Sequence, residues 1–237
     1  FFIFWGLPFF LGLSFLVAKA TRLGHWRKGD GWLALAAAVA LVYPLIVWVM
    51  ARLTVTFLTP GPAQAGPSPL DKLWHLLPLL AILTLALTLL LRRRAEEELP
   101  AEEGSSLFAL LLLFVGLFIT LAAELFFLRD IFGTRMNTMF KFYYQVWTLM
   151  AVASAFGLHY FLDRWQPRWS FLRAARGLWW AVLLLLLIMA SAYPLAATFT
   201  FTNGFHRKAT LDSLAFMERG SPGERQAIEF LRQQKDL

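Results

Sequence analysis

A run of charged and polar side chains between residues 124 and 145 interrupts an otherwise apolar sequence. It reads ELFFLRDIFGTRMNTMFKFYYQ and holds two acids and three bases. The residues in it that can do chemistry are Glu124, Arg129, Asp130, Arg135, Asn137, Lys141, Tyr144 and Gln145. Charges that lie so close to apolar runs are costly in a membrane, and they usually face a cavity or a partner.

Three kinds of chemistry fit these residue types. Arg129, Arg135 and Lys141 can hold a phosphate or diphosphate, since arginine gives bidentate contacts to such groups. Asp130 and Glu124 are then the candidate catalytic acids, which orient the arginines or act as a base towards an acceptor. The first alternative is an internal ion-pair network that locks two helices together. The second is an ion or proton pathway.

Helical spacing places much of this polarity on one face of a predicted helix. Asn137, Lys141, Tyr144, Gln145 and Thr148 follow at i, i+4, i+7, i+8 and i+11. Trp147 lies deeper on the same helix, where packing is the main expectation and lining a pocket is the alternative. The preceding apolar run carries a small and polar stripe suited to close helix packing: Gly116, Thr120, Ala123 and Glu124.

The elements that must position these residues are membrane-spanning helices. The chain has 237 residues, of which 59% are hydrophobic and 16% charged, whereas soluble domains have about a quarter charged. We predict an all-α, polytopic transmembrane helix bundle with six spans, at about 1–18, 32–50, 73–91, 107–128, 139–162 and 178–199. Phe1 already lies inside an apolar run, so we expect this chain to be the C-terminal part of a longer membrane domain.

The distribution of basic residues predicts the orientation. Eleven of the 22 lysines and arginines lie in segments 19–31, 92–105 and 163–177, which the positive-inside rule places in the cytoplasm. The motif 129–141 and the C-terminal segment 200–237 then face outward from a cell-membrane protein. In that segment, Ser221-Pro222-Gly223-Glu224 resembles a helix start, so we expect a short amphipathic helix with Ala227, Ile228 and Leu231 on its apolar face.

Other chemistries find little support. Asp71 and His75 are four residues apart, but two ligands are too few for a metal site, so we predict none in the protein itself, although a divalent metal can accompany a phosphate substrate. The chain has no cysteine, no nucleotide-binding glycine loop and no serine-hydrolase elbow. It has no basic helix with interleaved aromatic residues, so we expect no nucleic-acid partner.

At the central motif the sequence resembles a family of unknown function, the YYY-type polytopic membrane proteins of green non-sulfur bacteria and archaea. The resemblance rests on Glu124, on segment 128–130 (LRD), on segment 132–138 (FGTRMNT) and on segment 140–145 (FKFYYQ). Segment 210–215 (TLDSLA), followed by an aromatic residue, matches less well, since Ser213 stands where glycine is expected.

The YYY-type family is distantly similar to the C-type glycosyltransferases. This resemblance implies an enzyme that takes a sugar from a polyprenyl-phosphate carrier at the outer membrane face, with an acidic catalytic residue in an early outer loop. No cofactor is identified, and membrane lipids are the other expected partners. The alternatives are a non-catalytic subunit that associates with other membrane subunits, and a lipid or solute transporter.

Overall fold

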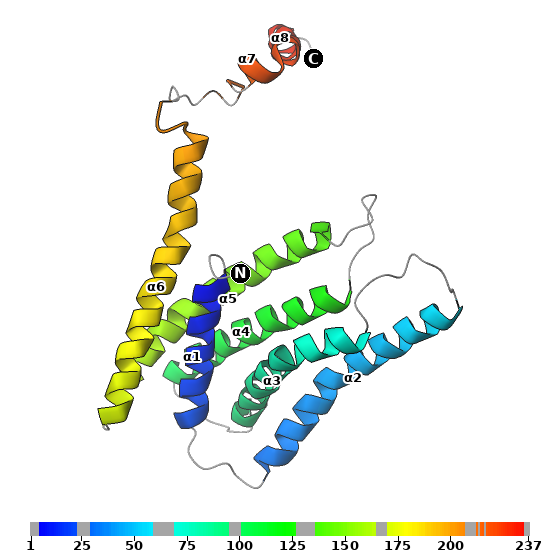
Figure 1. Cartoon of the computed structure of the whole chain (residues 1–237), viewed down its shortest axis with the longest axis vertical. Coiled ribbons are helices and arrows are strands. Elements are labelled where there is room, and N and C mark those ends of the chain that lie inside the picture. The colour runs from blue at the N-terminus through cyan, green and yellow to red at the C-terminus, as the bar shows by residue number, and fades with distance from the viewer. Residues whose placement is uncertain are drawn as a thin grey trace. The chain divides into compact units, whose positions relative to one another are not determined.

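The computed structural model of this chain is all helical in the residues that it describes. Those are residues 5–22, 29–58, 69–94, 101–126, 136–164, 170–206, 212, 214–215 and 217–234. The six longer helices are α1 (Leu7–Arg22), α2 (Asp30–Leu58), α3 (Pro69–Arg94), α4 (Ala101–Leu125), α5 (Met136–Arg164) and α6 (Ser170–Phe201). Two short helices follow, α7 (Met217–Gly220) and α8 (Pro222–Gln233). The predicted helical bundle is therefore confirmed (Figure 1).

Five of these helices, α2 to α6, are long and apolar enough to cross a membrane. Helix α1 has 16 residues and reaches about 24 Å, which is less than the roughly 30 Å of a hydrocarbon core. Prolines at 44, 78 and 194 lie inside α2, α3 and α6. Membrane helices tolerate them because neighbouring groups satisfy the freed carbonyls.

Most helices extend beyond the predicted spans. Helix α3 continues to Arg94 and α4 already begins at Ala101, so both enter the segment 92–105 that we predicted as a charged connection. Helix α1 likewise continues through Lys19 to Arg22. Apolarity marks only the hydrocarbon core, whereas helical hydrogen bonding continues through the polar layers, which make the whole bilayer about 40–45 Å thick. At one end α4 is shorter than predicted, because it stops at Leu125.

The chain divides into two compact units, residues 1–190 and 191–237. In the first unit, α5 packs against α4 and α1, α4 packs against α3, and α3 packs against α2 (Figure 1). Leucines dominate the shared core, together with Phe15 of α1 and Val146 and Met150 of α5. The indole of Trp179 in α6 donates a hydrogen bond of 2.9 Å to Ser14 of α1.

In the second unit, α6 ends in a left-handed turn. Asn203, Gly204 and Phe205 have φ angles of 52°, 65° and 63°. The amide of Gly204 donates to the carbonyl of Phe199, and the amide of Phe205 donates to the hydroxyl of Thr202, which satisfies groups at the helix end. Three consecutive residues with positive φ therefore end the helix and turn the chain.

The short C-terminal helix is also confirmed. Ser221 is the N-cap residue of α8, with Pro222 in the first turn, as predicted. Its side chain makes no capping bond, and its backbone carbonyl accepts the amides of Glu224 and Arg225 instead. The predicted boundary at 199/200 between a membrane domain and an outer segment stays a prediction.

Candidate functional site

Five of the eight predicted site residues lie in the part of the chain that the structure describes. Glu124 belongs to the last turn of α4, and Asn137, Lys141, Tyr144 and Gln145 belong to the first half of α5. The other three lie outside the described residues: Arg129, Asp130 and Arg135. The anion site as a whole therefore stays a prediction. The described residues are the end of α4 and the start of α5, which flank it.

Tyr143 of α5 connects Glu124 of α4 with Trp5, which lies just before α1. The hydroxyl of Tyr143 in α5 donates a hydrogen bond of 3.1 Å to the Oε1 atom of Glu124, and both side chains are half-buried. The ring of Tyr143 meets the edge of Trp5, with 5.5 Å between the ring centroids. Trp5 lies two residues before α1 begins. This hydrogen bond holds the carboxylate of Glu124 against α5.

Close packing of α4 on α5 supports this contact. A Cβ atom added at Gly116 would lie 3.1 Å from Cγ of Met150, so only a small residue allows the helices to approach so closely. Ala123 is buried as well, and the hydroxyl of Thr120 donates to the carbonyl of Gly116 within the helix. The small and polar stripe predicted on this span is thus confirmed as a packing surface.

The polar stripe of α5 lies on the opposite side of that helix from the core. Asn137, Lys141, Tyr144, Gln145 and Thr148 are all exposed. The buried face of α5 is instead formed by Val146, Met150, Ala153 and Gly157. Among the described residues, Lys141 has no ion-pair partner. The stripe is therefore a polar surface on a membrane-length helix that the described chain does not cover.

An aromatic cavity borders this stripe. Its volume is about 380 Å³, and it is lined by Trp5, Met139, Phe140, Tyr143, Tyr144 and Trp147. Tyr144 belongs to both the cavity lining and the stripe, so the polar and apolar surfaces meet along one edge. Trp147 lines this cavity and is 48% exposed, so the pocket-lining role is the one that the structure shows.

Two polar contacts at the other helix ends were missed in the sequence. Lys19 belongs to the basic segment 19–31 that we predict to be cytoplasmic, yet it is only 4% exposed. Its ammonium donates a hydrogen bond of 2.8 Å to Ser106 of α4 and lies 5.5 Å from the centroid of the Tyr160 ring. Lys19 follows Leu11 and Phe15 at four-residue intervals, and this spacing is the signal that would have placed it on the buried face.

The second missed contact links α2 to α3. Arg92 lies 3.4 Å from Asp30, and their side chains are 11% and 8% exposed. Arg92 lies in the basic segment 92–105 that we predict to be cytoplasmic, and nothing in the sequence indicates its partner. Neither contact belongs to the predicted motif, because the antiparallel order of the helices places these ends at the other side of the bundle. No group of three or more metal-ligating side chains occurs in the described ranges.

Comparison with known proteins gives one match. Residues 1–150 match the family model described as "Uncharacterized membrane protein (DUF2298)". No curated protein and no solved structure matches the chain. The matched part runs from the start of the chain to the middle of α5, so it includes every predicted site residue and all lining residues of the aromatic cavity. The chain therefore belongs to the DUF2298 family of uncharacterised membrane proteins.

Proposed function

We propose that this protein binds a polyprenyl-phosphate-linked sugar at the start of α5 and transfers the sugar at the outer membrane face. The observation that carries the proposal is the junction on α5 between the exposed polar stripe and the aromatic cavity. A lipid phosphate has the same two parts, a charged head and a hydrocarbon chain. The resemblance of the motif to the YYY-type family, and through it to the C-type glycosyltransferases, supports the same substrate class.

The head of such a lipid would contact the polar stripe. The ammonium of Lys141 is exposed, and the amides of Asn137 and Gln145 lie on the same face. Lysine binds phosphate as a point charge, and amide groups add hydrogen bonds to its oxygens. Arg129 and Arg135 precede α5 in the motif and would supply the bidentate contacts.

The hydrocarbon chain would occupy the aromatic cavity. Its lining combines Trp5 at the start of α1 with aromatic side chains of the first half of α5. Phe140 and Tyr144 are 63% and 57% exposed, so the cavity is reached from the side of α5 that the described chain leaves open. An apolar chain that enters from the surrounding lipid needs such an opening, whereas a water-soluble substrate would not favour these walls.

The reaction would transfer the sugar from phosphate to an acceptor hydroxyl. The bond between the anomeric carbon and the phosphate oxygen breaks, a new bond to the acceptor oxygen forms, and a carboxylate takes the hydroxyl proton. Asp130 and Glu124 are the two candidates for that base. Glu124 is already engaged by Tyr143 in the contact between α4 and α5, so Asp130 is the better candidate.

Binding is tested by photo-crosslinking in lipid nanodiscs with a polyprenyl-phosphate analogue that carries a photoreactive group on its chain. Lys141→Gln should weaken the crosslinking affinity about tenfold, because a charge-assisted contact is lost, and Arg135→Ala should abolish it. Arg52→Gln, at an exposed basic residue near the end of α2, is the matched control and should change nothing.

Transfer is tested with the same lipid carrying a labelled sugar. Asp130→Asn should stop transfer and leave crosslinking unchanged. Two results would overturn the proposal. The first is equal crosslinking by the corresponding polyprenol, which lacks the phosphate. The second is crosslinking of the α5 stripe to another membrane protein in place of lipid, since a polar helix interface would present the same residues.

A further inference from the structure

The last helix of the chain has an apolar face and no core of its own. Helix α8 has 12 residues, and none of them is buried. Phe230 and Leu231 are 61% and 57% exposed. A helix of this length is marginal in water unless packing on one face stabilises it. Something outside the described contacts must therefore cover the apolar side chains of α8.

Apolar and charged side chains are segregated around α8. Ala227, Ile228 and Leu231 follow at i, i+1 and i+4 and share one face, and Phe230 lies at its border. Arg225 and Glu229 lie on the other side, where Arg225 Nε donates a hydrogen bond of 2.9 Å to Glu229 Oε1. This arrangement is typical of helices that lie in the plane of a membrane surface.

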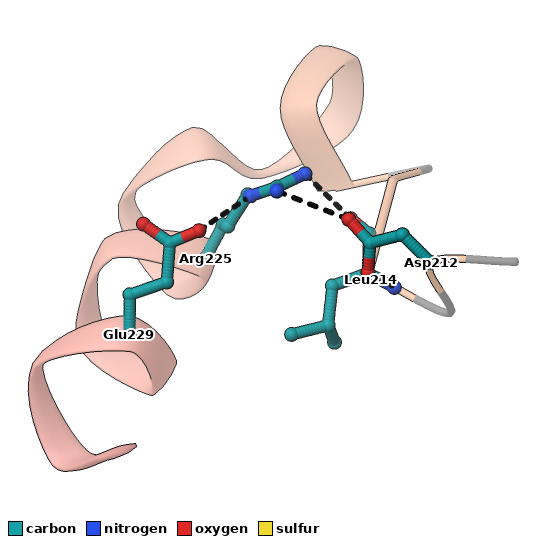
Figure 2. Close-up of polar contacts among 4 residues, drawn as sticks. All are labelled: Asp212, Leu214, Arg225 and Glu229. Atoms are coloured by element: carbon teal, nitrogen blue, oxygen red, sulfur yellow. Dashed lines mark hydrogen bonds and ion pairs between the residues drawn. The ribbon is translucent and has the colours of Figure 1, made fainter. Parts of the chain in front are cut away.

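Arg225, on the charged side of α8, has partners both within the helix and before it (Figure 2). Arg225 forms an ion pair of 3.1 Å with Asp212, and it also donates to the carbonyl of Leu214. The other carboxylate oxygen of Asp212 accepts the amide of Leu214. Arg225 therefore fastens the preceding segment to the polar side of the helix. The apolar face of Ala227, Ile228 and Leu231 stays uncovered by these contacts.

Connection to a membrane helix indicates what covers that face. Twenty residues separate Phe201, the end of α6, from Pro222, the start of α8. The end of α6 carries exposed Phe199, Phe201 and Phe205, and aromatic side chains gather at the membrane–water interface. Because α8 is tied to a chain already held in the membrane, it stays close to the lipid surface. Its effective concentration at that surface is in the mM range.

From these observations we infer that α8 is an interfacial membrane anchor, with Ala227, Ile228, Phe230 and Leu231 in the lipid surface next to the end of α6. Glu224 lies at the N-terminal end of the same face, so the last two turns enter most deeply. The helix has two acidic and two basic residues, and its binding therefore depends on the apolar side chains and not on anionic lipid. This anchor is independent of the proposed sugar transfer.

The test uses spin labels on the full chain in phosphatidylcholine vesicles. The chain has no cysteine, so each single-cysteine variant carries one label. A label at Leu231→Cys should collide with dissolved oxygen several-fold more than with a water-soluble nickel complex. A label at Gln226→Cys, on the exposed polar side, should show the reverse. Added phosphatidylglycerol should change neither ratio by more than about twofold.

A second pair of variants tests whether the apolar side chains hold α8 in the lipid surface. With the label at Ala227→Cys, Leu231→Asp should shift the collision ratio towards water, and Gln226→Asp should leave it unchanged. Equal exposure of positions 226 and 231 to the nickel complex would overturn the inference. Protection of position 231 from both reagents would overturn it too, because it would show that a protein surface covers α8, whether of a second copy or of another segment.

Discussion

At the residue scale, the hydrogen bond between Tyr143 and Glu124 is the best-defined polar contact of the candidate site. It links the last turn of α4 to the second turn of α5, and the ring of Tyr143 adds Trp5 to the same cluster. The contact fixes a carboxylate next to an exposed polar stripe. The neighbouring Tyr144 has a different environment, since its side chain is 57% exposed.

These two tyrosines give a matched pair of substitutions. Tyr143→Phe should lower the free energy of unfolding by about 1 kcal/mol, because Glu124 loses a hydrogen-bond donor at the helix interface. Tyr144→Phe should change it by less than about 0.5 kcal/mol, as surface substitutions usually do. Unfolding in mixed micelles measures the free energy of unfolding of both variants. Equal effects of the two variants would show that the hydrogen bond does not stabilise the α4–α5 pair.

At the scale of elements, α5 is the helix around which the first unit is built. It contacts α4 on one side and α1 on another, while its polar stripe faces away from both. The approach of α1 is closest at Gly157, where an added Cβ atom would lie 2.9 Å from Cβ of Phe15 and 3.4 Å from the carbonyl oxygen of Leu11. The carbonyl oxygen belongs to the backbone and the Cβ atom is bonded directly to it, so neither can move aside as the far end of a flexible side chain can.

Gly157→Ala should therefore destabilise the protein by about 1–3 kcal/mol, as overpacking in a closed contact does. Gly177→Ala in α6 is the control, because nothing lies within 4 Å of its added Cβ atom. That variant should be neutral or stabilise by up to about 1 kcal/mol through helix propensity. Thermal unfolding in one detergent compares them. The close α1–α5 contact would be contradicted by a neutral Gly157→Ala.

A largely buried ion pair between Asp30 and Arg92 links α2 to α3. Asp30→Ala and Arg92→Ala should each cost about 3 kcal/mol, since each leaves a charge of the opposite sign buried. The double variant should cost less than the sum of the two single ones, with a coupling energy of about 1 kcal/mol or more. A double-mutant cycle of unfolding free energies measures that coupling. Simple additivity would show that the two residues act independently.

At the scale of the whole molecule, the six longer helices run in alternating directions. The side of the membrane on which one connection lies therefore determines the side of all the others. The charge distribution predicts that residues 92–105 lie in the cytoplasm and that the C-terminal segment lies outside. We predict that a membrane-impermeant maleimide labels Gln226→Cys and not Gly104→Cys in intact cells, and labels both after the cells are opened. Both positions are exposed, and the chain has no cysteine to interfere. The opposite labelling pattern would reverse the orientation.

The sequence by itself determined the class of protein and the location of most helices. Long apolar runs can only be buried in lipid as helices, because each helix satisfies its own backbone hydrogen bonds. The capping pattern at Ser221 likewise predicted α8, and the small residues around Gly116 predicted a close helix contact on that span. These features depend on residues that are near one another along the chain, so periodicity and composition are enough to find them.

The tertiary structure decided which side chains meet. Lys19 and Arg92 belong to segments rich in basic residues. Lys19 is nevertheless buried and the Arg92 side chain is only 11% exposed, because Ser106 and Asp30 approach them from distant parts of the sequence. The same holds for the aromatic cavity, which Trp5, just before α1, lines together with Tyr143 and Trp147 of α5. Helical spacing assigns residues to a face, but only the packing of α4 and α1 on α5 decides which face is covered and which stays open.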